Sequence, residues 1–218
     1  MAEGRVIFDN ITKFIHYLFS CNISEIILIF LALLLGIPLP LVALQILWLN
    51  LVTDVFPALS LGWEPAEKNI MDRPPRDPDA AILTNKFKLL ILTQGLILAI
   101  GTLGAYIYTL NTTDNLAVAR TVAFVTLALV QLFHVFNVRG GGIFHLDRRI
   151  FSNVYMWGAI VLVLGLQALA IYTPLLNRVL RTVPLDLDSL FVVGAFTLLS
   201  LITIQVFNRA GFLNAIKV

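Results

Sequence analysis

Two carboxylic acids lie inside long apolar stretches of this chain, and polar side chains surround each of them. Glu25 lies three residues after Asn22. Asp54 lies four residues after Asn50 and directly after Thr53. Residues three or four apart lie on the same side of a helix, so each acid shares a helix face with polar neighbours. An ionisable group at membrane depth costs about 2.5–3.5 kcal/mol on insertion scales and marks an ion or proton pathway by default.

The chemistry of these side chains favours a hard cation. The set comprises two carboxylates, two amides and one hydroxyl, which offer oxygen but neither sulfur nor imidazole. Calcium is held by about 6–8 such oxygen ligands. On a later apolar stretch, Gln131 is the best candidate to complete the cage. Pro57 lacks an N–H, so it frees the carbonyl of Thr53 and is expected to break the helix beside Asp54.

Less specific interpretations exist for each residue taken alone. A single Asn or Thr within a membrane more often joins two helices by a hydrogen bond, and Glu25 alone would fit a protonated structural acid. His134 fits a hydrogen-bonded packing residue better than a proton carrier. Because five oxygen-bearing residues fall on two consecutive apolar segments beside a proline, the cation site is the stronger hypothesis.

The composition predicts an all-α, polytopic membrane protein that would place these residues on helices. Of the 218 residues, 59% are hydrophobic and 13% are charged, against about 25% charged in soluble domains. The basic residues are scattered, which argues against a nucleic-acid partner, and the single cysteine excludes an intrachain disulfide and a cysteine-based metal site. Six membrane spans are expected, at residues 23–37, 41–61, 89–110, 118–138, 154–172 and 190–207.

The first span is expected to continue a helix that begins outside the bilayer. Apolar residues recur at helical spacing from Phe8 to Phe19, so residues 5–22 are predicted to form a cytoplasmic stalk. Lysine and arginine are enriched in cytoplasmic loops. If both termini are cytoplasmic, the outer side holds only Arg120, Arg178 and Arg181 of the 15 basic residues, so this orientation is predicted.

Four segments carry a resemblance to a known family. They are Gly4–Ile11, Asn22–Glu25, Leu47–Asp54 and Ile70–Arg76, the last of which reads Ile-Met-Asp-Arg-Pro-Pro-Arg. Together they resemble the C-terminal membrane region of P-type cation-transporting ATPases, in the branch that contains the calcium pumps. The likeness implies that residues 1–218 form spans five to ten of a ten-span pump. It also implies that Asn22, Glu25, Asn50, Thr53 and Asp54 bind the ion, while Gln131 occupies a position that is glutamate in sarcoplasmic-reticulum-type pumps.

The resemblance also implies parts that the chain does not contain. The Asp-Lys-Thr-Gly segment that is phosphorylated in such pumps is absent from the sequence, so ATP and Mg²⁺ would act only through missing domains. The expected partners are the bilayer and the N-terminal part of a pump, and the expected cargo is Ca²⁺. Two alternatives are a freestanding transporter that couples ions to protons, and a remnant that binds and regulates an intact pump.

Overall fold

The structure is a computed structural model that describes residues 2–66, 82–139 and 151–209, and all regular secondary structure in these ranges is helical. Six segments are long and apolar enough to span a membrane, as the composition predicts. The motif Ile70–Arg76 lies outside the described residues. The elements are α1 (Ala2–Leu34), α2 (Ala43–Trp48), η1 (Leu49–Thr53), α3 (Val55–Gly62), α4 (Asn85–Thr113), α5 (Leu116–Val138), α6 (Val154–Tyr172), α7 (Pro174–Leu180) and α8 (Leu187–Arg209).

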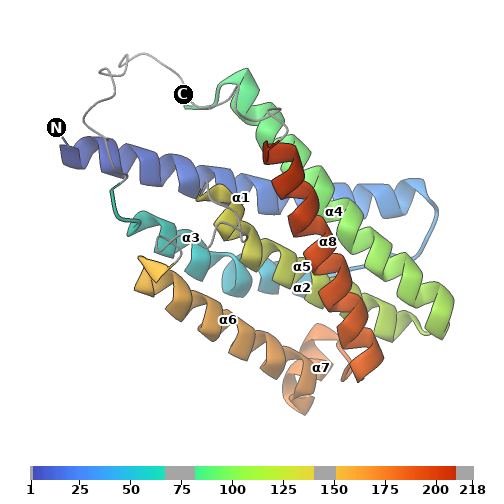
Figure 1. The fold of residues 1–218 in the computed structure, drawn as a ribbon. Coiled ribbons are helices and arrows are strands. Elements are labelled where there is room, and N and C mark those ends of the chain that lie inside the picture. The colour runs from blue at the N-terminus through green and yellow to red at the C-terminus, as the bar shows by residue number, and fades with distance from the viewer. Residues whose placement is uncertain (1, 67–81, 140–150, 210–218) are drawn as a thin grey trace.

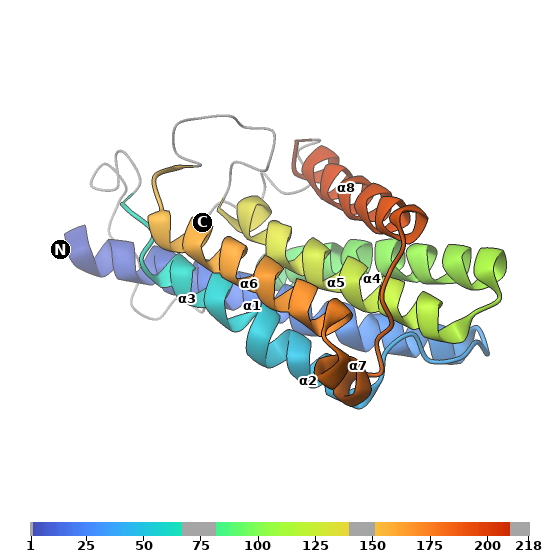
Figure 2. The same cartoon turned by 90° about the horizontal axis from the view of Figure 1, so that it is seen from below.

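The helices form a bundle around α5, the most buried span (Figure 1). On one side, α4 packs against α1 and α5, and α8 packs against α4 and α5. On the other side, α3 contacts α1 and α6, as the second view also shows (Figure 2). Of the apolar clusters among the described residues, the largest lies mainly among α1, α4 and α5, and the second largest among α1, α3, α5 and α6. The second span, α2–η1–α3, therefore lies beside both α1 and α5.

The turn between the first two spans is held to the rest of the bundle by its backbone carbonyls. After α1 ends, Gly36 adopts a left-handed conformation with φ of 65°, which glycine reaches without steric cost. The Tyr106 hydroxyl on α4 donates to the Pro38 carbonyl at 2.8 Å, and Arg120 Nε on α5 donates to the Leu39 carbonyl at 2.9 Å. Both bonds fix the position of α2 relative to α4 and α5.

The other end of the bundle is joined by a buried polar clamp centred on Glu64. Arg139, at the end of α5, forms an ion pair with Glu64 and donates from Nε at 2.8 Å. Asn153, before α6, donates to Glu64 Oε2 at 2.9 Å, and Asn10 of α1 donates to the Glu64 carbonyl at 3.0 Å. Removing one partner of a buried ion pair lowers the free energy of unfolding by several kcal/mol. The clamp therefore ties α1, α3, α5 and α6 together at one end.

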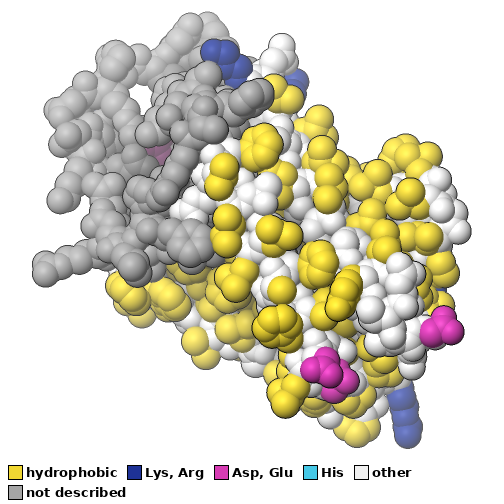
Figure 3. Space-filling view, turned by 45° about the vertical axis from the view of Figure 1, so that its right-hand side comes forward, with side chains coloured by type: hydrophobic (Ala, Val, Ile, Leu, Met, Phe, Trp, Pro, Cys, Tyr) yellow, Lys and Arg dark blue, Asp and Glu magenta, His cyan; other side chains and the backbone are white. Residues whose placement is uncertain are grey.

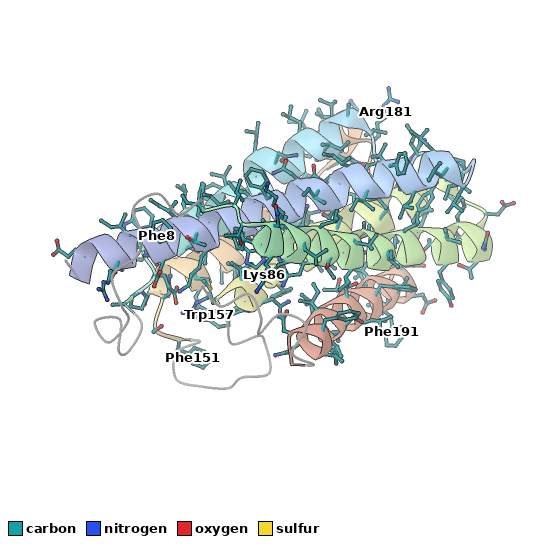
Figure 4. All side chains as sticks on the ribbon, turned by 90° about the horizontal axis from the view of Figure 1, so that it is seen from above. Phe8, Lys86, Phe151, Trp157, Arg181 and Phe191 are labelled. Atoms are coloured by element: carbon teal, nitrogen blue, oxygen red, sulfur yellow. The ribbon has the colours of Figure 1, made fainter. Side chains whose placement is uncertain are left out.

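The outer surface suits a lipid environment. Hydrophobic side chains are spread over the described part of the face in Figure 3, and acidic side chains appear there only in isolated places. Figure 4 shows Phe191 pointing outward from α8 and Arg181 at the end of the bundle remote from Phe8. Phe191 is 78% exposed. Apolar side chains at this exposure are unfavourable in water but favourable in hydrocarbon.

The close approach of α1 to α4 depends on a glycine, and this generates a first prediction. A Cβ at Gly95 would lie 2.9 Å from Ile23 Cγ2 and 3.1 Å from the Ser20 carbonyl oxygen. Gly95→Ala should lower the free energy of unfolding by about 1–3 kcal/mol, because the helices must separate or distort. Gly165→Ala is the control, since nothing lies within 4 Å of that position. Denaturation in detergent micelles, followed by circular dichroism, would show equal stabilities if this packing were unimportant.

Candidate cation site

The buried face of α1 presents three functional side chains to the second span. Tyr17, Cys21 and Glu25 are spaced by four residues, and their exposed fractions are 0%, 0% and 5%. Asn22 lies on a different side of the helix, where it is exposed and donates to the Leu18 carbonyl at 2.7 Å. The structure therefore places Glu25 with Tyr17 and Cys21, whereas the sequence grouped it with Asn22.

The second span supplies its polar residues from a widened turn. Residues Leu49–Thr53 form a π-helix, in which the Asp54 N–H donates to the Leu49 carbonyl five residues earlier at 2.9 Å. Such turns often occur at functional sites because they redirect side chains within a helix. Pro57 follows as the third residue of α3, where a missing N–H costs little. The turn directs Asn50 toward α1, and both Thr53 and Asp54 are fully buried.

Glu25 joins three helices through its two carboxylate oxygens. Asn50 Nδ2 of η1 donates to Oε2 at 2.7 Å, and Gln131 Nε2 of α5 donates to Oε1 at 3.1 Å. The same Gln131 nitrogen lies 3.3 Å from the Cys21 carbonyl oxygen. The two amides therefore stabilise a buried acid and hold α1, η1 and α5 in register at this point.

Asp54 has fewer partners than Glu25. Its Oδ1 accepts a long hydrogen bond from the Tyr17 hydroxyl at 3.4 Å. Among the residues that the structure describes, its Oδ2 is buried without a hydrogen-bond partner, as are Thr53 Oγ1 and Gln131 Oε1. Buried polar atoms are paired in the great majority of native structures. Three unpaired oxygens in one cluster therefore indicate that the site has ligand positions to offer.

The charge of the cluster also favours a bound cation. Within the described ranges neither Glu25 nor Asp54 forms a salt bridge, so two acids share a buried region with no basic side chain paired to either. Two neighbouring buried carboxylates disfavour each other's ionised form. A bound cation would offset both the repulsion and the loss of hydration.

Most of the ligands that the site could offer are oxygen atoms. They are not the clustered His, Cys, Asp and Glu side chains that bind transition metals. Among the residues described, no three His, Cys, Asp or Glu side chains converge closely enough to hold one ion. Amide, hydroxyl and carbonyl oxygens would have to complete the coordination, as they do for calcium. At present Asn50 and Gln131 turn their N–H groups toward Glu25, and a half-turn of either amide would present oxygen instead.

A second polar layer adjoins the cluster on the side of Tyr17. The rings of Tyr17 and His134 are stacked with centroids 6.4 Å apart, and His134 meets His16 edge-on at 6.1 Å. His16 Nε2 lies 2.6 Å from Gln94 Oε1. In contrast to the hydrogen-bonded packing residue expected from the sequence, His134 has no hydrogen-bond partner among the described residues for either ring nitrogen. Aromatic contacts position its ring.

Tyr17 and Cys21 are the members of the cluster that the sequence reasoning did not identify. Tyr17, Cys21 and Glu25 recur every four residues, and this spacing was the available signal. Asn22, by contrast, is not brought to the cluster, while Glu25, Asn50, Thr53, Asp54 and Gln131 are either hydrogen-bonded to one another or buried beside one another.

Several known proteins are similar to this chain in sequence. Residues 38–210 match the family model described as "Cation transporting ATPase, C-terminus". A calcium-transporting ATPase of Bacillus subtilis is 40% identical over 89% of the chain, and calcium-transporting ATPase 1 of Bacillus cereus is 34% identical over 96%. The human calcium-transporting ATPase type 2C member 1 is 34% identical over 89%. The chain spans only 22%, 25% and 21% of these relatives, respectively.

The hydrogen bonds of Gln131 generate a second prediction. Gln131→Leu should lower the free energy of unfolding by about 1–3 kcal/mol, because a buried oxygen of Glu25 loses its donor. Asn22→Leu, on an exposed side of α1, should not lower it, because an apolar side chain facing detergent carries no desolvation cost. Both are measured by denaturation in detergent with a calcium chelator present, so that ion binding contributes nothing. Equal effects of the two substitutions would contradict the assignment of Gln131 to the cluster.

Proposed function

Since this chain belongs to the family of cation-transporting ATPases, we propose that it is the ion-binding membrane region of a P-type pump and that its cargo is calcium. The observation that carries the proposal is the pair of buried acids, Glu25 and Asp54, on adjacent spans. Three buried oxygens there, Asp54 Oδ2, Thr53 Oγ1 and Gln131 Oε1, have no hydrogen-bond partner within the described part of the chain. A bound cation would offset the cost of burying two carboxylates, and the carboxylates would in turn hold the cation.

Calcium fits the proposed site better than softer or smaller divalent ions. Two carboxylates, the amides of Asn50 and Gln131 and the hydroxyl of Thr53 supply oxygen at variable distance, which suits the flexible coordination of calcium. The carbonyl of Thr53 adds a backbone ligand, because Pro57 has no N–H to bond it. Several relatives carry calcium transport in their names, and calcium is therefore the proposed cargo of this chain.

Asn22 is proposed as a ligand at the rim of the site. It lies three residues from Glu25 but on the exposed side of α1, between the exposed Phe19 and Ile26. A polar side chain there is unfavourable against lipid. Its rotation toward Glu25 would add an oxygen, and packing of the proposed partner, the N-terminal part of the pump, would cover it.

The proposed link between ATP hydrolysis and the ion site is helix α1. This helix runs without a break from Ala2 to Leu34 and carries Tyr17, Cys21 and Glu25 near its middle. We propose that its first part stands outside the bilayer as a stalk, with both chain termini in the cytoplasm, as the distribution of basic residues favours. ATP hydrolysis with Mg²⁺, in domains outside residues 1–218, would move this helix and reshape the ligands.

Calcium binding to the purified chain is the direct test. Glu25→Gln and Asp54→Asn should each weaken calcium binding at least about tenfold, which corresponds to about 1.4 kcal/mol. Asp188→Asn is the matched control, since Asp188 is exposed at the start of α8. Isothermal titration calorimetry in detergent would measure all four proteins. Calcium affinity that is insensitive to both acids, or equally sensitive to Asp188, would contradict the site.

The proposed role of α1 is tested in a full-length relative. A Gly-Gly insertion at the position of Lys13 should uncouple ATP hydrolysis from calcium uptake into vesicles, because glycine weakens and bends the helix. The same insertion at the position of Asp114, in the turn between α4 and α5, should leave the ratio of calcium transported to ATP hydrolysed much closer to that of the parent. An unchanged ratio in the Lys13 insertion would contradict the proposed mechanical link.

A further inference from the structure

The short helix α7 (Pro174–Leu180) presents two arginines at one end of the bundle. Arg178 lies in its last turn and Arg181 directly after it, and both side chains are exposed. Figure 4 shows Arg181 projecting from the end of the bundle remote from Phe8. Among the described residues neither arginine forms a salt bridge. Two guanidinium groups are therefore available to an anion from outside the chain.

The acids described at this end of the bundle belong to other elements. Asp114 ends α4, and Asp186 and Asp188 lie at the start of α8. The Asp186 carboxylate already accepts a hydrogen bond from the Ser189 N–H at 2.9 Å and so caps α8. The end of the bundle as a whole is thus not strongly basic, and the positive charge is local to α7.

Although α7 lies at the surface, the backbone around its end is fixed to two spans. Gln45 Nε2 of α2 donates to the Leu180 carbonyl at 3.1 Å. The Val183 N–H donates to Thr121 Oγ1 of α5 at 3.1 Å. Leu180 comes directly before Arg181 and Val183 two residues after it, so these bonds hold the segment from which the arginine projects.

The aromatic side chains of α6 indicate the level at which α7 lies in a bilayer. The 19 residues of α6 cover about 28 Å along its axis, close to the hydrocarbon thickness of about 30 Å. At one end Tyr155 is 65% exposed and its ring lies 5.3 Å from that of Trp63. At the other end Tyr172 is exposed as well. Tyr and Trp gather at the two membrane–water interfaces, and α7, which begins two residues after Tyr172, therefore lies at the level of the headgroups.

The apolar side chains of α7 suit the same position. Leu175 is 71% exposed and Val179 is 47% exposed, whereas Leu180 is buried against the bundle. Exposed apolar side chains on an interfacial helix can insert among acyl chains. Leu175 lies three residues before Arg178 and four before Val179, so the three share one side of the helix. That side offers an apolar surface and a cation to the same neighbouring molecule.

Arg181 occupies a backbone position that suits glycine. It ends α7 in the left-handed conformation, with φ of 53°. Glycine is the usual residue at such a helix end, because a Cβ is unfavourable there. An arginine at this position therefore carries a backbone cost, which a contact of its side chain would offset.

We propose that Arg178 and Arg181 bind the phosphate group of a phospholipid in the membrane leaflet beside α7. Leu175 and Val179 would lie against its acyl chains. Guanidinium binds phosphate through paired, charge-assisted hydrogen bonds. An anionic headgroup is preferred over a zwitterionic one, because the latter brings an ammonium group close to the arginines. This contact requires only that the chain spans a membrane, and it does not depend on calcium being the cargo.

Quenching of a tryptophan on α7 by brominated lipid tests the proposal. The full chain carrying Val179→Trp is reconstituted in mixed vesicles of phosphatidylcholine and phosphatidylglycerol, of which one or the other is brominated in its acyl chains. The signal of the chain without the substitution is subtracted, because the sequence has three tryptophans of its own. At low salt we expect phosphatidylglycerol to be preferred beside α7 by about fivefold or more.

Two substitutions separate lipid binding from folding. Arg181→Gly relieves the backbone, so the variant should unfold at no lower temperature than the parent, while its preference for phosphatidylglycerol should fall at least about twofold. Combining it with Arg178→Gln should abolish the preference. Lys88→Gln is the matched control, since Lys88 is exposed near the start of α4, at the opposite end of that helix from the turn to α5. It should leave the preference at α7 unchanged.

Equal quenching by the two brominated lipids in the folded chain would overturn the proposal. So would a preference that persists when both arginines are replaced, or one that is lost equally in Lys88→Gln. A preference that soluble inorganic phosphate removes at constant ionic strength would indicate a site for the free anion, and would also reject the lipid.

Discussion

The arrangement of this bundle depends on keeping two carboxylic acids, Glu25 and Asp54, inside an apolar interior. Removing an ionised carboxylate from water costs several kcal/mol even after relaxation, so every neighbour must offset that cost. Asn50 and Gln131 do so for Glu25 with one hydrogen bond each, and Tyr17 does so weakly for Asp54. We propose that a bound cation offsets the remainder of this cost.

The helices around the site are built to hold these groups in register. The π turn at Leu49–Thr53 sets the direction of the polar side chains of the second span, and α5 brings Gln131 from the centre of the bundle. Fixed contacts lie at both ends: the clamp at Glu64 on one, and the bonds of Tyr106 and Arg120 to the α1–α2 turn on the other. Between them, α1 passes from end to end, so a movement of that helix would alter the ligands directly.

Much of the fold and of the candidate site could be predicted from the sequence, because apolar length defines membrane spans and acids within such spans are conspicuous. Six spans were expected, and six helices in the described ranges are long and apolar enough to cross a membrane. The partners on α1 were harder to assign, because a residue three positions away and one four positions away are both helix neighbours of Glu25. Asn22 was predicted as a partner because it is polar. The orientation of α1 relative to η1 and α5 instead places Tyr17 and Cys21 on the buried face beside Glu25. The π turn and the lack of partners for His134 depend on tertiary packing, which local sequence does not encode.

We propose that Glu25 and Asp54 bind the same cation through their carboxylates. Infrared difference spectroscopy of the purified chain, recorded before and after calcium addition, observes this coordination directly through the carboxylate stretching bands. Calcium should shift these bands, and the shift should be reduced when either acid is replaced by its amide and lost when both are. A difference spectrum without carboxylate bands, or one that survives the double replacement, would contradict it.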